Sequence, residues 1–184
     1  MKKIVHSSLL FMLLFLLFGF SGFGQIISQY VETDSGTEPK GIEIWNNTGA
    51  VLDFSTNSLV IEKGTNGGTP SEDFSLTSGT LASGDVLVIG TADMETTTLA
   101  NGSVFYFKGF TFNGDDALVV KYGGTTTDVF GTPGSDPGSA WTGSGVSTSN
   151  QNIELLSGIT NGDLDGWTDP SERFETVNTS PSGP

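Results

Sequence analysis

The chain has 184 residues, with 21 acidic side chains against 7 basic ones, a formal net charge of −14 and no cysteine. Such a surface repels a phosphate polymer, and the basic residues after Lys2 and Lys3 are scattered singly, so nucleic acid is excluded as a partner. Without cysteine, an exported form of the chain has to be held by core burial rather than by disulfides.

Residues 1–24 are predicted to be a secretory signal peptide. The first three residues carry positive charge, residues 9–18 form an unbroken apolar run, and small residues follow it. The apolar run is short for a membrane span, so we expect cleavage before Gln25 and no span in the mature chain. Residues 25–184 are then expected to form one domain with a secreted, periplasmic or extracellular-surface location.

Cleavage of this signal would also remove His6, the only histidine. Without histidine or cysteine, the mature chain lacks residues for a Ser-His-Asp triad, a Cys-His dyad or an ordinary zinc site. Carboxylates are the groups left for chemistry, and we predict no catalytic residue.

Short apolar blocks recur along the mature chain with turn residues between them. Residues 40–46 alternate apolar and polar side chains, which predicts a strand with one buried face, whereas residues 86–89 are continuously apolar and suit a sheet interior. Residues 93–100 are predicted to form a short helix with Asp93 as its N-cap. The predicted strands are 26–32, 40–46, 51–54, 58–61, 74–76, 86–89, 104–107, 117–120, 125–130 and 152–155.

The clearest local signal is a β-hairpin over residues 117–130. Its two strands are joined by Gly123 and Gly124, which accept positive φ, and the run NGDD at 113–116 is turn chemistry. About nine or ten short strands, with turn signals every 8 to 12 residues, predict an all-β fold, an antiparallel β-sandwich with at most one short helix.

Five motifs taken together resemble the lamin-tail domain. They are ISQYVE at 27–32, GIEIWN at 41–46, LASGDV at 81–86, NGDDAL at 113–118 and DPGSAW at 136–141. The resemblance covers nearly the whole mature chain in order, and it implies an immunoglobulin-like sandwich. Bacterial members of that family are mostly exported modules. The chromatin partners of animal members do not carry over, because of the signal peptide and the acidic charge.

Residues 161–172 have the spacing of a calcium loop. Oxygen-bearing side chains fall at loop positions 1, 3, 5, 9 and 12, and glycine falls at position 6. The alternative is an acidic, glycine-rich surface turn without an ion. The candidate Ca²⁺ ligands are Asn161, Asp163, Asp165, Trp167, Asp169 and Glu172.

A second acidic group is predicted from Asp115, Asp116 and Asp128 on the facing strand. These carboxylates would suit an ion or the paired acids of glycoside hydrolysis. The alternative, which we favour, is that the aspartates after Asn-Gly cap the turn backbone, since neighbouring residues of a strand point to opposite faces.

Trp45 and Trp141 are candidates for contact with a partner or a glycan, because amphipathic aromatic side chains are common at interfaces. Trp45 falls at the polar phase of its strand and is the better candidate. For Trp141 and Trp167 we favour packing of long loops back onto the fold. The phenylalanines at 105, 107, 110 and 112 are predicted to be core.

Two functions remain open. The first is an exported, non-enzymatic module for protein or cell-surface interaction, with or without a structural calcium ion. The second is a carbohydrate-binding or carbohydrate-active surface protein. The second function requires an exposed tryptophan beside acidic residues in a groove.

Overall fold

The computed structural model describes residues 24–33 and 38–179. The predicted signal peptide, apart from Gly24, lies outside the described residues. The described part is mostly β, with one short α-helix and three 3₁₀ turns. No helix within it is long and apolar enough to cross a membrane.

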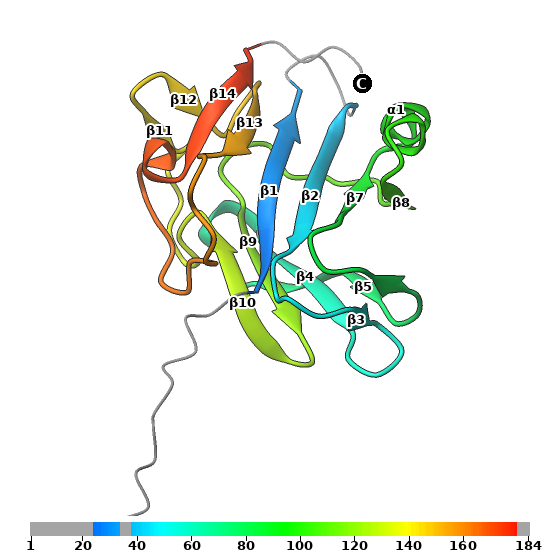
Figure 1. Ribbon diagram of the computed structural model, residues 1–184. Helices are drawn as coiled ribbons and strands as arrows, with labels where there is room; N and C mark the ends of the chain where they lie inside the picture. Colours follow the sequence, from blue (N-terminus) through cyan, green and yellow to red (C-terminus); the bar gives the residue numbers. More distant parts are fainter. Residues whose placement is uncertain (1–23, 34–37, 180–184) are drawn as a thin grey trace, which may run out of the picture.

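The larger sheet has six strands in the order β14-β13-β1-β2-β7-β8 (Figure 1). Neighbouring strands are antiparallel except for β7 and β8, which are parallel, so the prediction of a purely antiparallel fold is wrong at this edge. The strands of this sheet are β1 (Gln25–Glu32), β2 (Lys40–Asn46), β7 (Val86–Gly90), β8 (Val104–Phe107), β13 (Asn152–Leu155) and β14 (Phe174–Asn178).

The second sheet has four strands in the order β10-β9-β4-β5, and two short ribbons pair β3 with β6 and β11 with β12. The 3₁₀ turns are η1 (Thr65–Gly67), η2 (Ala92–Met94) and η3 (Pro170–Glu172). The remaining strands are β3 (Leu52–Asp53), β4 (Leu59–Gly64), β5 (Ser71–Leu76), β6 (Thr80–Leu81), β9 (Ala117–Tyr122), β10 (Thr125–Phe130), β11 (Thr142–Gly143) and β12 (Val146–Ser147).

The hairpin prediction is confirmed. β9 and β10 pair antiparallel, and they are joined by Gly123 and Gly124, whose φ angles are 56° and 80°. Two consecutive residues with positive φ form the type I′ turn that matches the twist of a hairpin, which is why glycine is needed at both positions.

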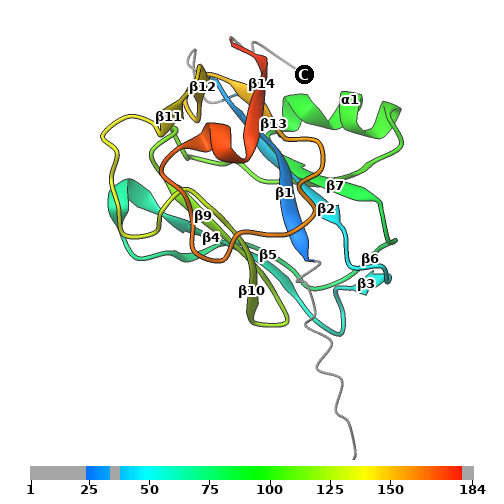
Figure 2. The same cartoon turned by 60° about the vertical axis from the view of Figure 1, so that its left-hand side comes forward.

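One buried apolar cluster takes side chains from both larger sheets, which face each other in Figure 2. In β2, Ile42 and Ile44 are buried while the alternating Glu43 is half-buried, as the sequence pattern predicts. Tyr30 of β1 stacks on Phe130 of β10 with ring centroids 4.5 Å apart, which joins the two sheets at the centre of the cluster.

The aromatic run around β8 divides between core and surface. Phe110 and Phe112 are buried, as predicted, but Phe107 is 65% exposed and Phe105 is half-buried. The prediction of a core role fails for these two residues because β8 is the last strand of its sheet, so no further strand covers them.

The predicted helix is present as α1 (Glu95–Ala100), but Asp93 is not its N-cap. Met94 stands at that position, and Asp93 instead accepts a hydrogen bond of 2.7 Å from the Thr91 hydroxyl. The Met94 sulfur lies over Gly41 and Gly90, where an added Cβ would come within 2.7 and 2.8 Å of it. These glycines let the helix lie close against the outer face of the larger sheet.

Candidate functional site

The predicted calcium loop is closed by its own carboxylates. Asp163 Oδ1 accepts the backbone N–H groups of Asp165 and Gly166 at 2.8 and 2.7 Å. Asp169 Oδ1 accepts the backbone N–H and the hydroxyl of Ser171 at 2.9 and 2.6 Å. Each carboxylate therefore caps a turn, which is the usual role of aspartate in a tight loop.

The other predicted calcium ligands do not form a common site with Asp163 and Asp169. Asn161, Asp165 and Glu172 are exposed, whereas Trp167 is buried and its carbonyl accepts the Thr132 hydroxyl at 2.8 Å. No group of three or more His, Cys, Asp or Glu side chains in the described ranges lies close enough to hold a metal ion. Calcium binding by this loop stays a prediction.

A buried carboxylate anchors the same loop to the sheets. Asp128 on β10 is 2% exposed and accepts N–H groups from Asp163 at 2.7 Å and from Ile27 at 2.8 Å. Arg173 Nη2 lies 3.6 Å from its Oδ1. Burial raises the pKa of Asp128 from 3.8 to about 7, against the opposing effect of Arg173 and the two N–H donors. Asp128 thus ties strand β1, strand β10 and the loop together.

The three aspartates of the second acidic group do not meet. Asp116 lies before β9 and accepts the Asn66 N–H at 2.8 Å, whereas Asp128 pairs with Val120 further along the hairpin. Asp115 is 5% exposed, and burial and the charge of Asp116 raise its pKa. The grouping is wrong because the register places Asp128 several residues along the strand from the turn.

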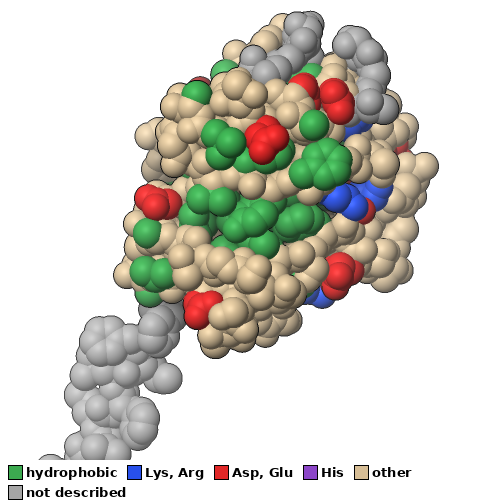
Figure 3. All heavy atoms as spheres, turned by 90° about the vertical axis from the view of Figure 1, so that its right-hand side faces the viewer, with side chains coloured by type: hydrophobic (Ala, Val, Ile, Leu, Met, Phe, Trp, Pro, Cys, Tyr) green, Lys and Arg blue, Asp and Glu red, His purple; other side chains and the backbone are tan. Residues whose placement is uncertain are grey.

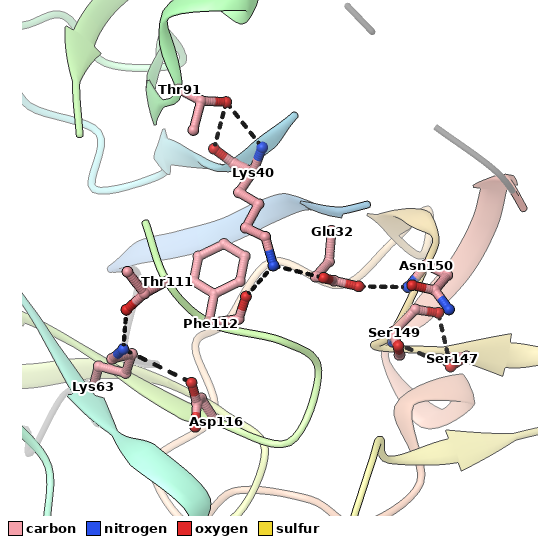
Figure 4. Close-up of polar contacts among 10 residues, drawn as sticks. All are labelled: Glu32, Lys40, Lys63, Thr91, Thr111, Phe112, Asp116, Ser147, Ser149 and Asn150. Atoms are coloured by element: carbon pink, nitrogen blue, oxygen red, sulfur yellow. Dashed lines mark hydrogen bonds and ion pairs between the residues drawn. The ribbon is translucent and has the colours of Figure 1, made fainter. Parts of the chain in front are cut away.

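A buried ion pair was not predicted. Lys40 Nζ lies 2.7 Å from Glu32 Oε1 and also donates to the carbonyl oxygen of Phe112 at 2.5 Å (Figure 4). The second oxygen of Glu32 accepts the Asn150 N–H at 2.6 Å. The sequence held one indication of this pair: the predicted strand 26–32 ends at Glu32 and the next, 40–46, begins at Lys40. These two residues are opposite each other in the register.

Trp141 and Trp167 pack against each other, with ring centroids 6.1 Å apart and side chains 3% and 4% exposed. Trp141 also lies over Gly131, where a Cβ would come within 2.7 Å of its ring. A ligand cannot reach a side chain buried to this degree, so the candidacy of Trp141 as a contact residue is corrected. The packing agrees with the alternative role expected for both residues.

Trp45 has a different setting. It is half-buried on the outer face of the larger sheet and lines a shallow hollow of about 310 Å³ with Glu43 and Glu154. Glu43 accepts the Ser28 hydroxyl at 2.7 Å. Burial raises the pKa of Glu43, and the charge of Glu154 adds to this effect, while the Ser28 hydrogen bond opposes it.

A second hollow of about 560 Å³ adjoins the first on this face and shares Gln29 and Glu43 with it. Its far wall is the 92–101 segment, including Met94 and Thr98. In the strand register, Gln29 pairs with both Glu43 and Glu154, so the two carboxylates lie in one row across three strands. Both hollows are open and have mixed polar and apolar linings.

Exposed apolar side chains gather at the β8 edge of the larger sheet. Phe107, Leu99 and Val104 are 65%, 54% and 39% exposed, and α1 packs beside β8. Figure 3 shows hydrophobic side chains gathered at the centre of this face, with charged side chains around them. The sequence predicted a core position for Phe107 and did not indicate this surface, because an apolar strand has the same sequence pattern at an edge as in the interior.

Comparison of the chain with models of known protein families, with curated proteins and with solved structures finds no match.

Proposed function

We propose that the chain is an exported, non-enzymatic module of the lamin-tail type that binds a protein or a cell surface through its apolar edge. The observation that carries this proposal is the exposure of Leu99, Val104 and Phe107 beside one edge strand of a protein with a net charge of −14. Covering such a surface is favourable for any partner that fits it, because apolar area leaves water.

We infer for the fold an immunoglobulin-like sandwich of the two larger sheets. In support, one buried cluster holds Ile27 and Ile44 from the six-stranded sheet with Ile61 and Val120 from the four-stranded one. The motif at 41–46 of the resemblance coincides with β2. Such a body leaves its edges and loops for contact with other molecules.

A non-enzymatic role is supported by what the aspartates do. Asp116, Asp128 and Asp163 each accept backbone N–H groups. A carboxylate held in this way stabilises a turn or joins two segments, and it has less freedom to move a proton to a substrate.

A second candidate function is carbohydrate binding at the outer face. It is favoured by one observation, that Trp45 shares a hollow with Glu43 and Glu154. An indole can stack on a sugar ring, and carboxylates can accept hydrogen bonds from its hydroxyl groups. The hollow is shallow, so we rank this function below protein or cell-surface contact.

Two measurements distinguish the two functions: binding of the labelled full chain to intact cells that export this protein, and its binding to a glycan array. We expect Phe107→Thr to lower cell binding about tenfold, an effect of about 1.4 kcal/mol. Val177→Thr, at the opposite edge strand of the same sheet, is the matched control and should bind like the unaltered chain, because Val177 is also exposed, at 51%. A glycan hit abolished by Trp45→Ala, with no effect of Phe107→Thr, would establish the second function instead.

A further inference from the structure

We propose that β8 receives an extended, positively charged segment of a partner protein as an added strand of the larger sheet. This inference rests on the proposed function and names the partner's chemistry. Strand addition requires three things of an edge: free backbone groups, side chains that anchor the incoming strand, and a field that selects its charge.

The outer backbone of β8 is free to pair. β8 ends the six-stranded sheet among the described residues, and its inner side pairs with β7. The Lys108 N–H donates to the Gly90 carbonyl oxygen at 2.8 Å, so by alternation Tyr106 also faces β7. The N–H and C=O groups of Phe105 and Phe107 therefore point away from the sheet, toward the place of an added strand.

β8 also lacks the devices that usually protect an edge. Natural edge strands carry charged residues, proline or a covering segment, which prevents pairing with another chain. Two other edge strands carry exposed carboxylates, Glu175 in β14 and Glu72 in β5. β8 has the sequence VFYF, with neither charge nor proline.

The side chains of β8 offer anchors on both faces. Val104 and Tyr106 pair with Leu87 and Ile89, two core residues, and therefore point toward the core side. Phe107 pairs with Gly90 and points to the opposite side, where α1 lies. An incoming strand with apolar residues at alternate positions would cover Val104 on one face or Phe107 on the other.

Charges around this edge select a cationic partner. Glu72 and Asp73 belong to the neighbouring edge strand β5, and Asp93 and Glu95 belong to the helical segment above β8. Lys108 is the one nearby cation in the described segments 71–76 and 92–108, and its ammonium group lies 2.9 Å from Asp73 Oδ1. These two segments therefore hold four carboxylates and one ammonium group, and this excess of negative charge attracts lysine or arginine and repels acidic segments.

The same charge disfavours a second copy of this chain as the occupant. Two chains that each carry a net charge of −14 repel one another, and pairing β8 with β8 would bring Glu72, Asp93 and Glu95 of both copies together. Like charges at a paired edge are destabilising, and natural proteins use them to prevent such pairing.

The test uses a fluorescent ten-residue peptide of alternating lysine and valine with the full chain, read by anisotropy. A control peptide has the same sequence but is N-methylated at every residue, which removes the N–H groups of both edges. A second control alternates glutamate and valine. We expect the first peptide to bind, and both controls to bind at least tenfold more weakly. We expect Phe107→Thr to weaken binding about tenfold.

Val177→Thr should leave binding of the lysine peptide unchanged, and added peptide should protect the Phe105 and Phe107 amides from hydrogen exchange. Equal binding of the N-methylated peptide, or no protection at β8, would overturn strand addition. If the chain alone forms dimers and Phe107→Thr dissociates them, the occupant of the edge is a second copy of this chain and not a cationic partner. If the lysine peptide does not bind while cell binding still depends on Phe107, strand addition is wrong and the proposed function stands.

Discussion

The buried carboxylates and the exposed apolar side chains of this molecule lie in different regions and have different roles. At the 161–173 side, the carboxylates of Asp128 and Asp163 are enclosed by backbone N–H groups and by Arg173. At the β8 edge, Phe107 and Val104 meet water directly. The carboxylates, which are candidates for catalysis, thus form hydrogen bonds within the fold. The apolar side chains, which are typical of a core, are exposed at its edge.

This difference teaches how an acidic chain without histidine or cysteine in its described part is stabilised. A desolvated charge without partners is strongly unfavourable. The buried Glu32 has such partners and joins segments distant in sequence, through Lys40 and Asn150. Recognition is then left to apolar side chains, whose exposure is tolerated at an edge.

The largest expected effect comes from breaking the buried ion pair. Glu32→Ala leaves Lys40 charged and unpaired in a buried site, so we expect the free energy of unfolding to fall by about 3–5 kcal/mol. Urea unfolding followed by tryptophan fluorescence measures this change. Glu175→Ala, on the exposed face of β14, is the control and should change it by less than about 0.5 kcal/mol. Equal losses in both variants would mean that the pair is not structural.

A second prediction concerns the pH dependence of Asp128. Burial raises its pKa from 3.8 to about 7, so the folded protein holds this proton more tightly than the unfolded chain does. The contribution of Asp128 is therefore fully present below about pH 4 and is lost as the pH rises from about 4 to about 7, a change of about 4 kcal/mol.

The measurement is urea unfolding of the unaltered chain and of Asp128→Asn at pH 5 and pH 8. We expect the unaltered chain to lose stability relative to the variant between these values, because the variant has no carboxyl group to ionise. A difference between the two proteins that stays constant with pH would show that Asp128 does not titrate in this range.

The calcium prediction gives a smaller effect. Asp163→Ala removes the acceptor for two backbone N–H groups, which should lower the free energy of unfolding by about 1–2 kcal/mol. Because these carboxylates already cap turns, we expect a chelator to leave the melting temperature of the unaltered chain unchanged. A rise in melting temperature with added Ca²⁺, absent from a variant with Asp163→Ala and Asp165→Ala, would show that the loop binds the ion.

The smallest effect on stability is expected at the apolar edge. Phe107 is 65% exposed, so Phe107→Thr should alter the free energy of unfolding by less than about 0.5 kcal/mol while lowering partner binding. The same urea titration checks this value. A loss above about 2 kcal/mol would mean that Phe107 is a core residue, and would remove the distinction between edge and interior.

The sequence alone predicted most of the larger elements and few of the contacts between them. β2, β8 and β13 have the predicted bounds, because alternation or aromatic content marks them locally. The fold has more strands than predicted, because β6, β11 and β12 have two residues each and are too short to show a period. β14 was missed after a loop rich in aspartate and glycine.

The site was less predictable for a physical reason. Whether Asp128 lies beside Asp116 or beside Asp163 depends on register and loop closure, which link residues far apart in the sequence. Whether Phe107 is buried depends on whether another strand follows β8 in the sheet. Neither property is encoded in a local window of residues.

Residue-resolved amide hydrogen exchange of the free chain tests the central contrast most directly. The amides of Ile27 and Asp163, both bonded to the buried Asp128, should exchange slowly, and that of Tyr106 should be protected by pairing with β7. The amides of Phe105 and Phe107 should exchange much faster than that of Tyr106. Protection of Phe105 and Phe107 equal to that of Tyr106 in the absence of any partner would contradict the account, because the edge would then already be paired.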